Sequence, residues 1–367
     1  MPLHKLSVKE FRPDRIFKKL YQIAQFCKRY HSPLTFKYYL SLLYYLHLQI
    51  RKGFRQDEIF SLGLLSSSPS DKKSNKYISH LEFNKTLRTL NPIHLWVMVS
   101  ANKGIFYMDC KNLNLPIPEL YAILFRDFLS VSFRNSSLLK RDNLIEFIKN
   151  ELPSEFCIKP TTGTGGIFVN TYTKTDDGII DGFGEFKTEQ AIYENIMNNK
   201  RYDSFIVQER LKNHPYLSKI HLSENLHTLR IITLVNSSGQ CRILHGHINI
   251  ATGQEIASQH GSLKISISLN DGSLEYGVFI DKKNGGFKKV NEHPETGQDF
   301  REFKLPLWEQ VISLSKEAAL KFLPLRTLGW DIAITEKGVL ILETNTLYLP
   351  PYYFRPMDRF IDTLLNA

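Results

Sequence analysis

The sequence contains few cysteines, and they lie far apart. Its 367 residues include four, none of them in a CxxC or Cys/His spacing: Cys27, Cys110, Cys157 and Cys241. A structural zinc site or a disulfide framework requires such spacing. The pattern argues against both kinds of site and predicts a reducing, cytoplasmic location.

Long apolar runs and common targeting or nucleotide motifs are also missing. The most lipophilic stretch, residues 38–50, is interrupted by His47 and Gln49 and is shorter than the roughly 20 residues of a membrane-spanning helix. Basic residues recur in the first twenty positions, where a secretory signal would have its apolar core. No GxxxxGK[ST] motif occurs, which argues against a Walker P-loop. We therefore expect neither export nor a membrane span.

Acidic residues are scarce only at the beginning of the chain. Residues 1–55 hold twelve Lys or Arg against Glu10 and Asp14, so this segment alone accounts for the net charge of +10. The rest is neutral, which leaves no reason to expect nucleic-acid binding by the whole protein. The basic segment is expected to dock a protein partner, to lie on an acidic membrane surface, or simply to be solvated.

Apolar periodicity predicts a mixed α+β fold. Residues 1–90 have the three- and four-residue spacing of amphipathic helices, with a polar loop at 66–76, and a further helical pattern at 91–150 is broken by Pro116 and Pro118. Beyond residue 151, short strand-like runs precede one long helix at about 307–322. The predicted divisions are 1–90, 91–150 and 151–367, the last with lobes at about 151–212 and 213–350.

Near the C-terminus, two strand-like runs surround a turn and carry one acid each. If residues 336–338 form the loop, Thr335 pairs with Val339 and Asp331 lies directly across from Glu343. Side chains so placed share one face of the hairpin, and two like charges there repel unless a cation neutralises them. A two-residue turn would instead put the acids on opposite faces.

The same pairing predicts what surrounds Glu343. Side chains alternate along a strand, so Asn345, Val339 and Ile341 are expected on the face of Glu343. The apolar pair would keep the acids out of open solvent. Two carboxylates and an amide oxygen suit Mg²⁺, which takes oxygen ligands and completes its shell with water and phosphates.

A second group of residues suits phosphate. Lys159 ends an apolar strand and is followed by Pro-Thr-Thr-Gly-Thr-Gly-Gly at 160–166. Glycines let backbone N–H groups close around phosphate oxygens, and a lysine supplies positive charge. Farther along, Arg230 lies among apolar neighbours, and a buried guanidinium needs an anion. That anion is either a structural carboxylate or a substrate phosphate.

Taken in order, these segments resemble the sugar-transfer-associated ATP-grasp proteins, a group of the ATP-grasp superfamily related to α-L-glutamate ligases. The resemblance extends from about residue 91 to 351 and depends on the order of its motifs. They are Asn91-Pro92, Asn102 to Phe106, Leu115 to Pro118, Lys159 to Gly166, Gln208 to Leu211, Thr228 to Arg230, His293 to Gly297, Gly329 to Asp331 and Glu343 to Asn345.

The resemblance implies two α+β lobes with ATP between them, and it implies roles for single residues. Lys159 and Arg230 would act in catalysis, with Arg230 steadying the transferring phosphoryl group or the acyl intermediate. Asp331, Glu343 and Asn345 would hold Mg²⁺. The nucleotide contacts it implies are Lys103, Lys159, Thr162, Gly163, Gly165, Gly166, Gln208, Glu209, Arg210 and Leu211.

The resemblance also implies a reaction. A substrate carboxylate would attack the γ-phosphorus of ATP to give an acyl phosphate and ADP, and an amine or a thiol would then displace the phosphate. The substrates would be small-molecule or glycan-linked carboxylates and amines, in cell-surface polysaccharide or glycoconjugate biosynthesis. Two alternatives remain: an ATP-grasp kinase that phosphorylates a hydroxyl, and a non-catalytic basic binding protein with a degenerate ATP-grasp fold.

The acceptor side is less defined by the sequence. Residues 257–262 lack the Asp-Asn pair and adjacent glycines that the family pattern leads one to expect there. Six histidines are candidates for lining the substrate cleft, although a lone histidine is more often structural. They are His214, His221, His227, His245, His247 and His260.

Overall fold

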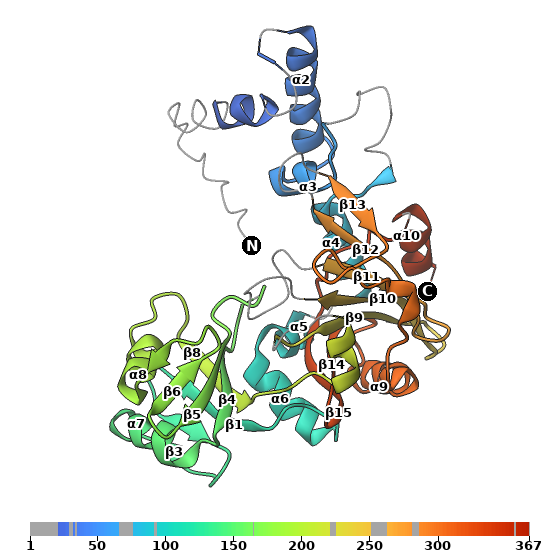
Figure 1. The fold of residues 1–367 in the computed structure, drawn as a ribbon. Helices are drawn as coiled ribbons and strands as arrows, with labels where there is room; N and C mark the ends of the chain where they lie inside the picture. The colour runs from blue at the N-terminus through green and yellow to red at the C-terminus, as the bar shows by residue number, and fades with distance from the viewer. Residues whose placement is uncertain are drawn as a thin grey trace, which may run out of the picture. The chain divides into compact units, whose positions relative to one another are not determined.

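The computed structural model describes residues 21–366 apart from 29–31, 34, 66–75, 92–93, 164, 221–224, 251–262, 281–285 and 356. The chain forms two compact units. Unit 1 comprises Met1–Phe83, Ile280–Lys288 and Pro356–Asp358, and unit 2 comprises the remainder (Figure 1). The predictions made for residues 1–20, for nearly all of the loop at 66–76 and for the loop at 257–262 fall outside the described residues.

The N-terminal part of unit 1 contains helices. Residues 21–27 form a helix, followed by α2 (Phe36–Ile50), α3 (Gln56–Ser61) and the start of α4 (His80–Leu90). Thr35 caps α2 by accepting a hydrogen bond from the backbone N–H of Tyr38. Phe26 and Tyr45 pack with ring centroids 5.5 Å apart. The predicted helical character of 36–50 is confirmed.

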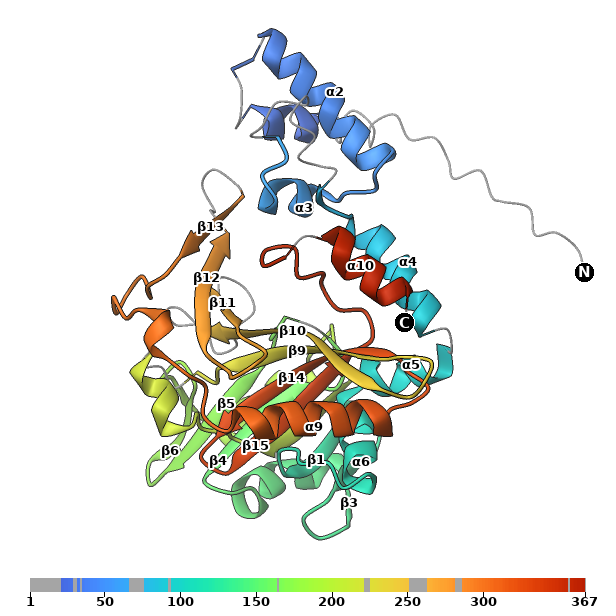
Figure 2. The same cartoon turned by 90° about the vertical axis from the view of Figure 1, so that its right-hand side faces the viewer.

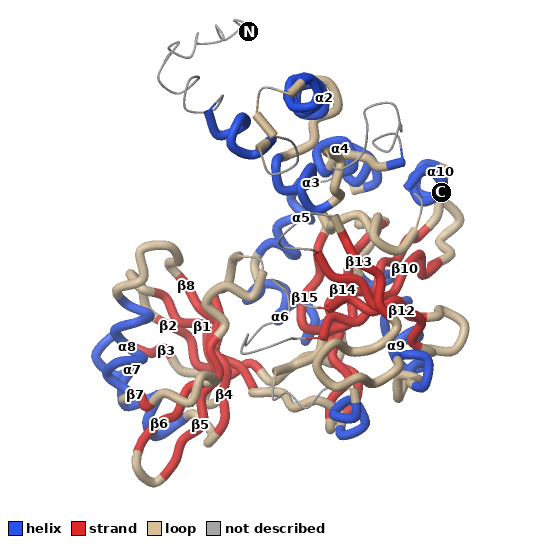
Figure 3. The backbone as a smooth tube through the Cα atoms, turned by 45° about the horizontal axis from the view of Figure 1, so that its top comes forward, coloured by secondary structure: helices blue, strands red, loops and turns tan. Residues whose placement is uncertain are grey.

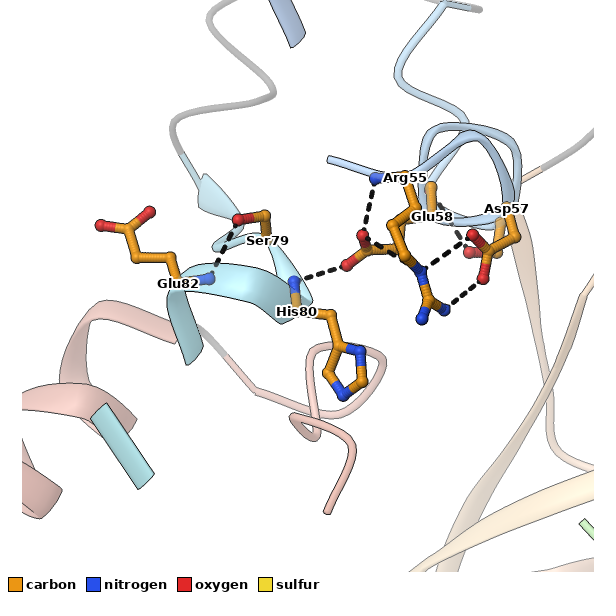
Figure 4. Close-up of polar contacts among 7 residues, drawn as sticks. Arg55, Asp57, Glu58, Ser79, His80 and Glu82 are labelled. Atoms are coloured by element: carbon orange, nitrogen blue, oxygen red, sulfur yellow. Dashed lines mark hydrogen bonds and ion pairs between the residues drawn. The ribbon is translucent and has the colours of Figure 1, made fainter. Parts of the chain in front are cut away.

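A buried carboxylate joins two segments of unit 1. Glu58, in α3, accepts hydrogen bonds from the backbone N–H of Arg55 at 2.8 Å and from that of His80 at 2.6 Å (Figure 4). The first bond completes a capping box for α3. At the start of α4, Ser79 accepts from the backbone N–H of Glu82. Glu58 is only 3% exposed. The hydrogen bonds that its carboxylate accepts therefore offset the free-energy cost of burying it.

The first sheet of unit 2 has eight strands in the order β3-β2-β1-β8-β4-β5-β6-β7. Its neighbouring strands pair antiparallel. The helices α7 and α8 lie beside this sheet (Figure 3), and their apolar side chains share a core with it. The bounds are β1 Leu120–Phe125, β2 Ser130–Ser132, β3 Leu138–Leu139, α7 Leu144–Glu146, β4 Glu155–Pro160, β5 Asn170–Thr175, β6 Gly178–Asp181, β7 Phe186–Lys187, α8 Glu189–Met197 and β8 Ser204–Glu209.

The second sheet has seven strands in the order β13-β12-β11-β10-β9-β14-β15. The helix α9 lies along one face of it (Figure 2) and contributes Val311, Leu314 and Ala318 to the largest core of the chain. The bounds are β9 Thr228–Val235, β10 Cys241–Ile250, β11 Leu263–Ile267, β12 Leu274–Ile280, β13 Phe287–Val290, α9 Trp308–Lys321, β14 Thr327–Thr335 and β15 Gly338–Asn345, with α10 Met357–Leu365 following.

The helices α5 (His94–Ala101) and α6 (Lys103–Asn112) precede the first sheet. The expected helical pattern at 91–150 is therefore right for its first part and wrong for residues 120–139, which supply β1, β2 and β3. The reason is that Leu120–Phe125 is a short apolar run, which periodicity cannot assign to a strand or a helix. Among the described residues, every helix falls short of the length and apolarity that crossing a bilayer demands.

Asn91, which directly follows α4, belongs to the Asn91-Pro92 motif and has a structural role. Its side-chain amide donates to the carbonyl of Thr327 at 2.8 Å, and its side-chain oxygen accepts from the backbone N–H groups of Arg326 and Thr327. These three bonds fix the start of β14, the strand that carries Asp331. Asn91 thus acts on the fold and lies away from the pocket described below.

Candidate functional site

One pocket of unit 2 is lined by residues of both sheets, of α6 and of the glycine-rich loop. Twelve of the fourteen residues singled out in the sequence line it: Lys103, Lys159, Thr162, Gly163, Gly165, Gly166, Gln208, Glu209, Arg210, Leu211, Asp331 and Glu343. Arg230 and Asn345 lie directly behind them, in contact with Asp331 and Glu343 respectively. Residues from four separate parts of the sequence therefore meet at one place.

The β14–β15 hairpin places Asp331 opposite Glu343, but by a route that differs from the predicted one. The turn has two residues, and Thr335 pairs with Gly338, not with Val339. The three-residue loop was therefore wrong. A register shift between Asp331 and Ile332 then adds one residue to β15, so that Asp331 and Glu343 are again direct partners. This β-bulge restores the alignment that a two-residue turn alone would have lost.

The bulge also changes which apolar residues accompany Glu343. Val339 and Ile341 belong to the large core, together with Ile332, so the prediction that they share the face of Glu343 was wrong. Leu342 takes that place and lines the pocket beside Glu343. The cause is the extra residue, which reverses the side-chain alternation on one side of the bulge. The acids still adjoin apolar surface.

Arg230 and the two acids form a compact charged group. Arg230 Nε lies 2.8 Å from Asp331 Oδ1, and its Nη2 donates to Oδ2 at 3.0 Å. Burial raises the pKa of Asp331 to about 7, against the opposing effect of Arg230. Burial alone would raise the pKa of Glu343 too, but Lys103 and the hydrogen bond with Asp331 lower it to about 2. The negative charge of Glu343 and burial thus both favour the protonated form of Asp331, because two like charges held this close do not both ionise readily.

Gly329 makes room for that arginine. A Cβ atom added at Gly329 would lie 3.1 Å from Arg230 Nη1 and 2.8 Å from the Cβ of Tyr348. Any larger residue would therefore displace Tyr348 and crowd the Arg230 guanidinium. The sequence did not single out Gly329 for this reason, although it lies in the same motif as Asp331.

Lys103 connects three segments at the beginning of α6. Its backbone N–H donates to the carbonyl of Thr161 at 2.7 Å, and its Nζ donates to the carbonyl of Gly163 at 2.9 Å. The same Nζ lies 3.2 Å from Glu343 Oε2. The side-chain oxygen of Asn102 caps the helix by accepting hydrogen bonds from the backbone N–H groups of Gly104 and Ile105. The lysine is thereby held between the glycine-rich loop and the acidic hairpin.

Lys159 lies deeper in the pocket. It is 8% exposed, and its Nζ donates to the hydroxyl of Tyr107 at 3.0 Å while lying 5.2 Å from the centre of that ring. The Tyr107 hydroxyl also lies 2.9 Å from Gln208 Oε1 and 3.0 Å from the carbonyl of Leu342. Burial lowers the pKa of Lys159 and raises that of Tyr107. Sequence reasoning missed Tyr107, because a tyrosine inside a helix carries no local signal of such a role.

The loop after Lys159 has a backbone that glycine alone adopts easily. Gly163, Gly165 and Gly166 all have positive φ, at 123°, 78° and 68°. A Cβ atom at Gly163 would also lie 3.1 Å from the hydroxyl of Tyr202. Thr164 falls outside the described residues. The loop thus brings main chain, without side-chain bulk, to the edge of the pocket.

The end of β8 contributes polar and apolar groups together. The Glu209 carboxylate forms an ion pair with Lys337 and accepts from the backbone N–H of Glu119 at 3.3 Å. Arg210 donates to Thr173 Oγ1 at 2.6 Å. Further pocket residues that sequence reasoning did not assign a role are Cys157, Ile167, Val169, Thr171, Asn225, Leu226, Thr228 and Leu342. Many are apolar, as a site for a flat ring requires.

The candidate histidines do not line the pocket where the structure describes them. His214 accepts from the backbone N–H of Tyr216 and begins a short 3₁₀ helix. His245 Nε2 lies 3.0 Å from His247 Nδ1, and both rings pack against Phe354 with centroids 5.2 Å away. His227 is fully buried. His221 and His260 fall outside the described residues.

The buried histidine pair makes stability depend on pH. Burial, aided by Arg355, lowers the pKa of His245 to about 3, so between about pH 6.5 and 3 only the unfolded chain takes up this proton. Stability is therefore lost as the pH falls through this window. We expect His245 to account for about 2 kcal/mol of unfolding free energy lost between pH 7 and pH 5.

Urea unfolding followed by tryptophan fluorescence at the two pH values measures this loss. His245→Gln should show a smaller pH dependence than the wild type, because glutamine does not titrate. Equal losses in the two proteins would contradict the prediction.

Comparison with known proteins gives one family match. The model of the family described as sugar-transfer associated ATP-grasp matches residues 82–353. A search of curated proteins finds no match.

Several solved structures are similar in fold. D-Alanyl-alanine synthetase A from Vibrio cholerae O1 biovar eltor is 13% identical, with a TM-score of 0.40 over 73% of this chain and 64% of that one. The biotin carboxylase domain of 2-oxoglutarate carboxylase from Hydrogenobacter thermophilus is 13% identical, with a TM-score of 0.43 over 74% of this chain and 46% of that one. The chain spans less than two thirds of either protein. On the family match, the chain belongs to the sugar-transfer associated ATP-grasp family and has its α+β fold.

Proposed function

We propose that the protein is an ATP-dependent carboxylate–amine or carboxylate–thiol ligase that acts through an acyl phosphate. The observation that carries this proposal is the meeting of Lys103 and Lys159 with Asp331 and Glu343 in one pocket. Phosphoryl transfer depends mainly on positioning and on electrostatic stabilisation. Opposite charges placed around a single cavity are what that chemistry requires.

The residues of the pocket fit a nucleotide triphosphate with a divalent cation. Three cations, Lys103, Lys159 and Arg230, surround two acids, which leaves positive charge for a polyanion. Among the described residues, no three His, Cys, Asp or Glu side chains gather into a metal site. Asp331 and Glu343 with Asn345 would therefore hold Mg²⁺ only together with water and nucleotide phosphates, as this ion prefers. When bound, it would offset the negative charge of the phosphates.

The apolar part of the pocket supports a place for the purine. Ile167, Leu226 and Leu342 offer flat contact area, while the end of β8 presents main-chain groups and Glu209. Glu209 would accept hydrogen bonds from the hydroxyl groups of the ribose. In the structure, one oxygen of its carboxylate pairs with Lys337. The Gly163 to Gly166 loop would bring its main chain over the phosphates.

The charged group around Arg230 supports its part in the transfer. Its guanidinium is fixed by Asp331 and by the space at Gly329, so it can donate to an oxygen of the transferring phosphoryl group without reorganising. The substrate carboxylate would attack the γ-phosphorus, and ADP would leave. The amine or thiol would then attack the acyl carbon and release phosphate.

The acceptor pathway is part of the proposal. The family name links these proteins to sugar transfer, which supports carboxylates and amines that are small molecules or parts of a glycan, in cell-surface polysaccharide or glycoconjugate synthesis. The supporting observation is this name alone, so the acceptors are the first thing to test.

Screening pairs of carboxylates and amines for stimulated ADP release tests the proposal. With the carboxylate labelled by ¹⁸O, an acyl phosphate intermediate transfers one labelled oxygen to the phosphate released. Labelled phosphate together with an amide or thioester is the expected result. ADP with a phosphorylated product and no free phosphate would identify a kinase instead. No magnesium-dependent ATP binding at all would indicate a non-catalytic protein.

A further inference from the structure

The helix α2 has apolar residues on two opposite faces. Tyr38, Tyr45 and Leu48 are buried in unit 1. The opposite face is exposed and carries large apolar side chains at three- and four-residue steps. Its members, with their exposed fractions, are Phe36 77%, Tyr39 52%, Leu40 37%, Leu43 65% and Ile50 76%.

This exposed face, which we call the α2 stripe, is as wide as the apolar stripe with which a helix normally faces a core. At 100° per residue its five members fall within roughly 100° of the helix circumference. The exposed His47 falls in the same sector, between Leu43 and Ile50. A largely apolar face of this width marks a site of interaction, whereas single exposed apolar residues are ordinary. With 15 residues, α2 is too short to cross a bilayer. It can, however, lie in the plane of a membrane interface.

The charge around the stripe indicates what covers it. Lys37 is exposed beside Phe36, and Arg51 is exposed directly after Ile50, while α2 itself contains no acid. Residues 1–55 as a whole hold twelve basic residues and two acidic ones. A second copy of this chain would bring like charges together, whereas a surface of anionic lipid headgroups would attract them.

We propose that α2 lies on an anionic membrane surface, with the α2 stripe among the acyl chains and the basic residues at the headgroups. This inference goes beyond the ligase proposal and does not depend on it. It places the protein at a lipid surface without requiring α2 to cross the bilayer. The protein would then encounter a membrane-attached substrate by diffusion in the plane of the membrane instead of through solution.

Cosedimentation of the full chain with vesicles tests the proposal. Phosphatidylcholine vesicles are compared with vesicles of phosphatidylcholine and phosphatidylserine, at low and high salt. We expect binding to the anionic vesicles that weakens with salt. Leu43→Gln should reduce the partition coefficient by about tenfold or more, since one leucine no longer enters the acyl region. The double variant K37Q/R51Q should reduce it by about thirtyfold at low salt.

The matched control is Leu81→Gln, because Leu81 is a leucine of unit 1 that is 57% exposed and lies outside the stripe. It should bind vesicles as the wild type does. Circular dichroism shows that each variant is folded. Absence of binding to anionic vesicles, equal binding to neutral ones, or unchanged binding by Leu43→Gln would overturn the proposal. So would a lipid-free oligomer that Leu43→Gln dissociates, since the stripe would then be a protein interface.

Discussion

Glu343→Gln is expected to reduce magnesium-dependent ATP turnover by about a thousandfold or more. The substitution keeps the size of the side chain and removes the charge that Lys103 meets at 3.2 Å. It also leaves Asp331 as the last carboxylate of the hairpin site. Since Mg²⁺ strongly prefers charged oxygen ligands, the Mg²⁺ concentration for half-maximal turnover should rise as well.

A matched variant separates this effect from a general change of charge. Glu336→Gln alters an exposed acid in the turn of the same hairpin, outside the pocket, and should keep wild-type turnover. ADP release is measured for all three proteins over a range of Mg²⁺ concentrations, with circular dichroism as the check of folding. A folded Glu343→Gln protein that turns over ATP as the wild type does would refute the assignment of the acids.

Lys159→Met is expected to weaken nucleotide binding by about a hundredfold without destabilising the protein. Losing a charge-assisted hydrogen bond to phosphate costs roughly 1.5 to 3 kcal/mol. Burial already lowers the pKa of this lysine, which means that the fold gains little from holding it charged. Methionine fills much the same volume, so thermal stability should stay constant or rise.

The two readouts distinguish a ligand contact from a structural one. If Lys159 served only to support Tyr107, the variant would lose stability and keep its affinity for nucleotide. Calorimetric titration with a non-hydrolysable ATP analogue gives the affinity, and thermal unfolding gives the stability. Lys212→Met is the control, because Lys212 is 53% exposed and paired with Glu155; it should change neither value appreciably.

The fold could be predicted from the sequence where patterns were long or strongly marked. The helix predicted at 307–322 is α9, and the strand-like runs predicted beyond residue 151 include β4, β8, β9 and β10. The strands at 120–139 were missed because short apolar runs lack a diagnostic period. Pairing partners distant in sequence, such as β1 and β8, leave no local trace.

The candidate site likewise has features that the sequence predicted and features that it did not. Residue types and motif order identified most of the pocket, but not the path by which Asp331 meets Glu343. A two-residue turn and a three-residue loop both suited the sequence at 336–338, and the bulge between Asp331 and Ile332 left no sequence signal that distinguished them. Tyr107 was missed for a different reason: its partners Lys159, Gln208 and Leu342 come together only in the folded chain.

The hydroxyl of Tyr107 has a consequence for how the pocket can open. It contacts Gln208 and Lys159 of the first sheet and the Leu342 carbonyl of the second. Pulling the sheets apart at this point would expose several buried polar groups at once, each with a cost when left unpaired. A small rotation of one sheet against the other about this phenol would disturb these contacts less than separation of the sheets. If a nucleotide enters between the sheets as proposed, the contacts of Tyr107 would favour a pivot at this phenol, with wider movement at the glycine-rich loop.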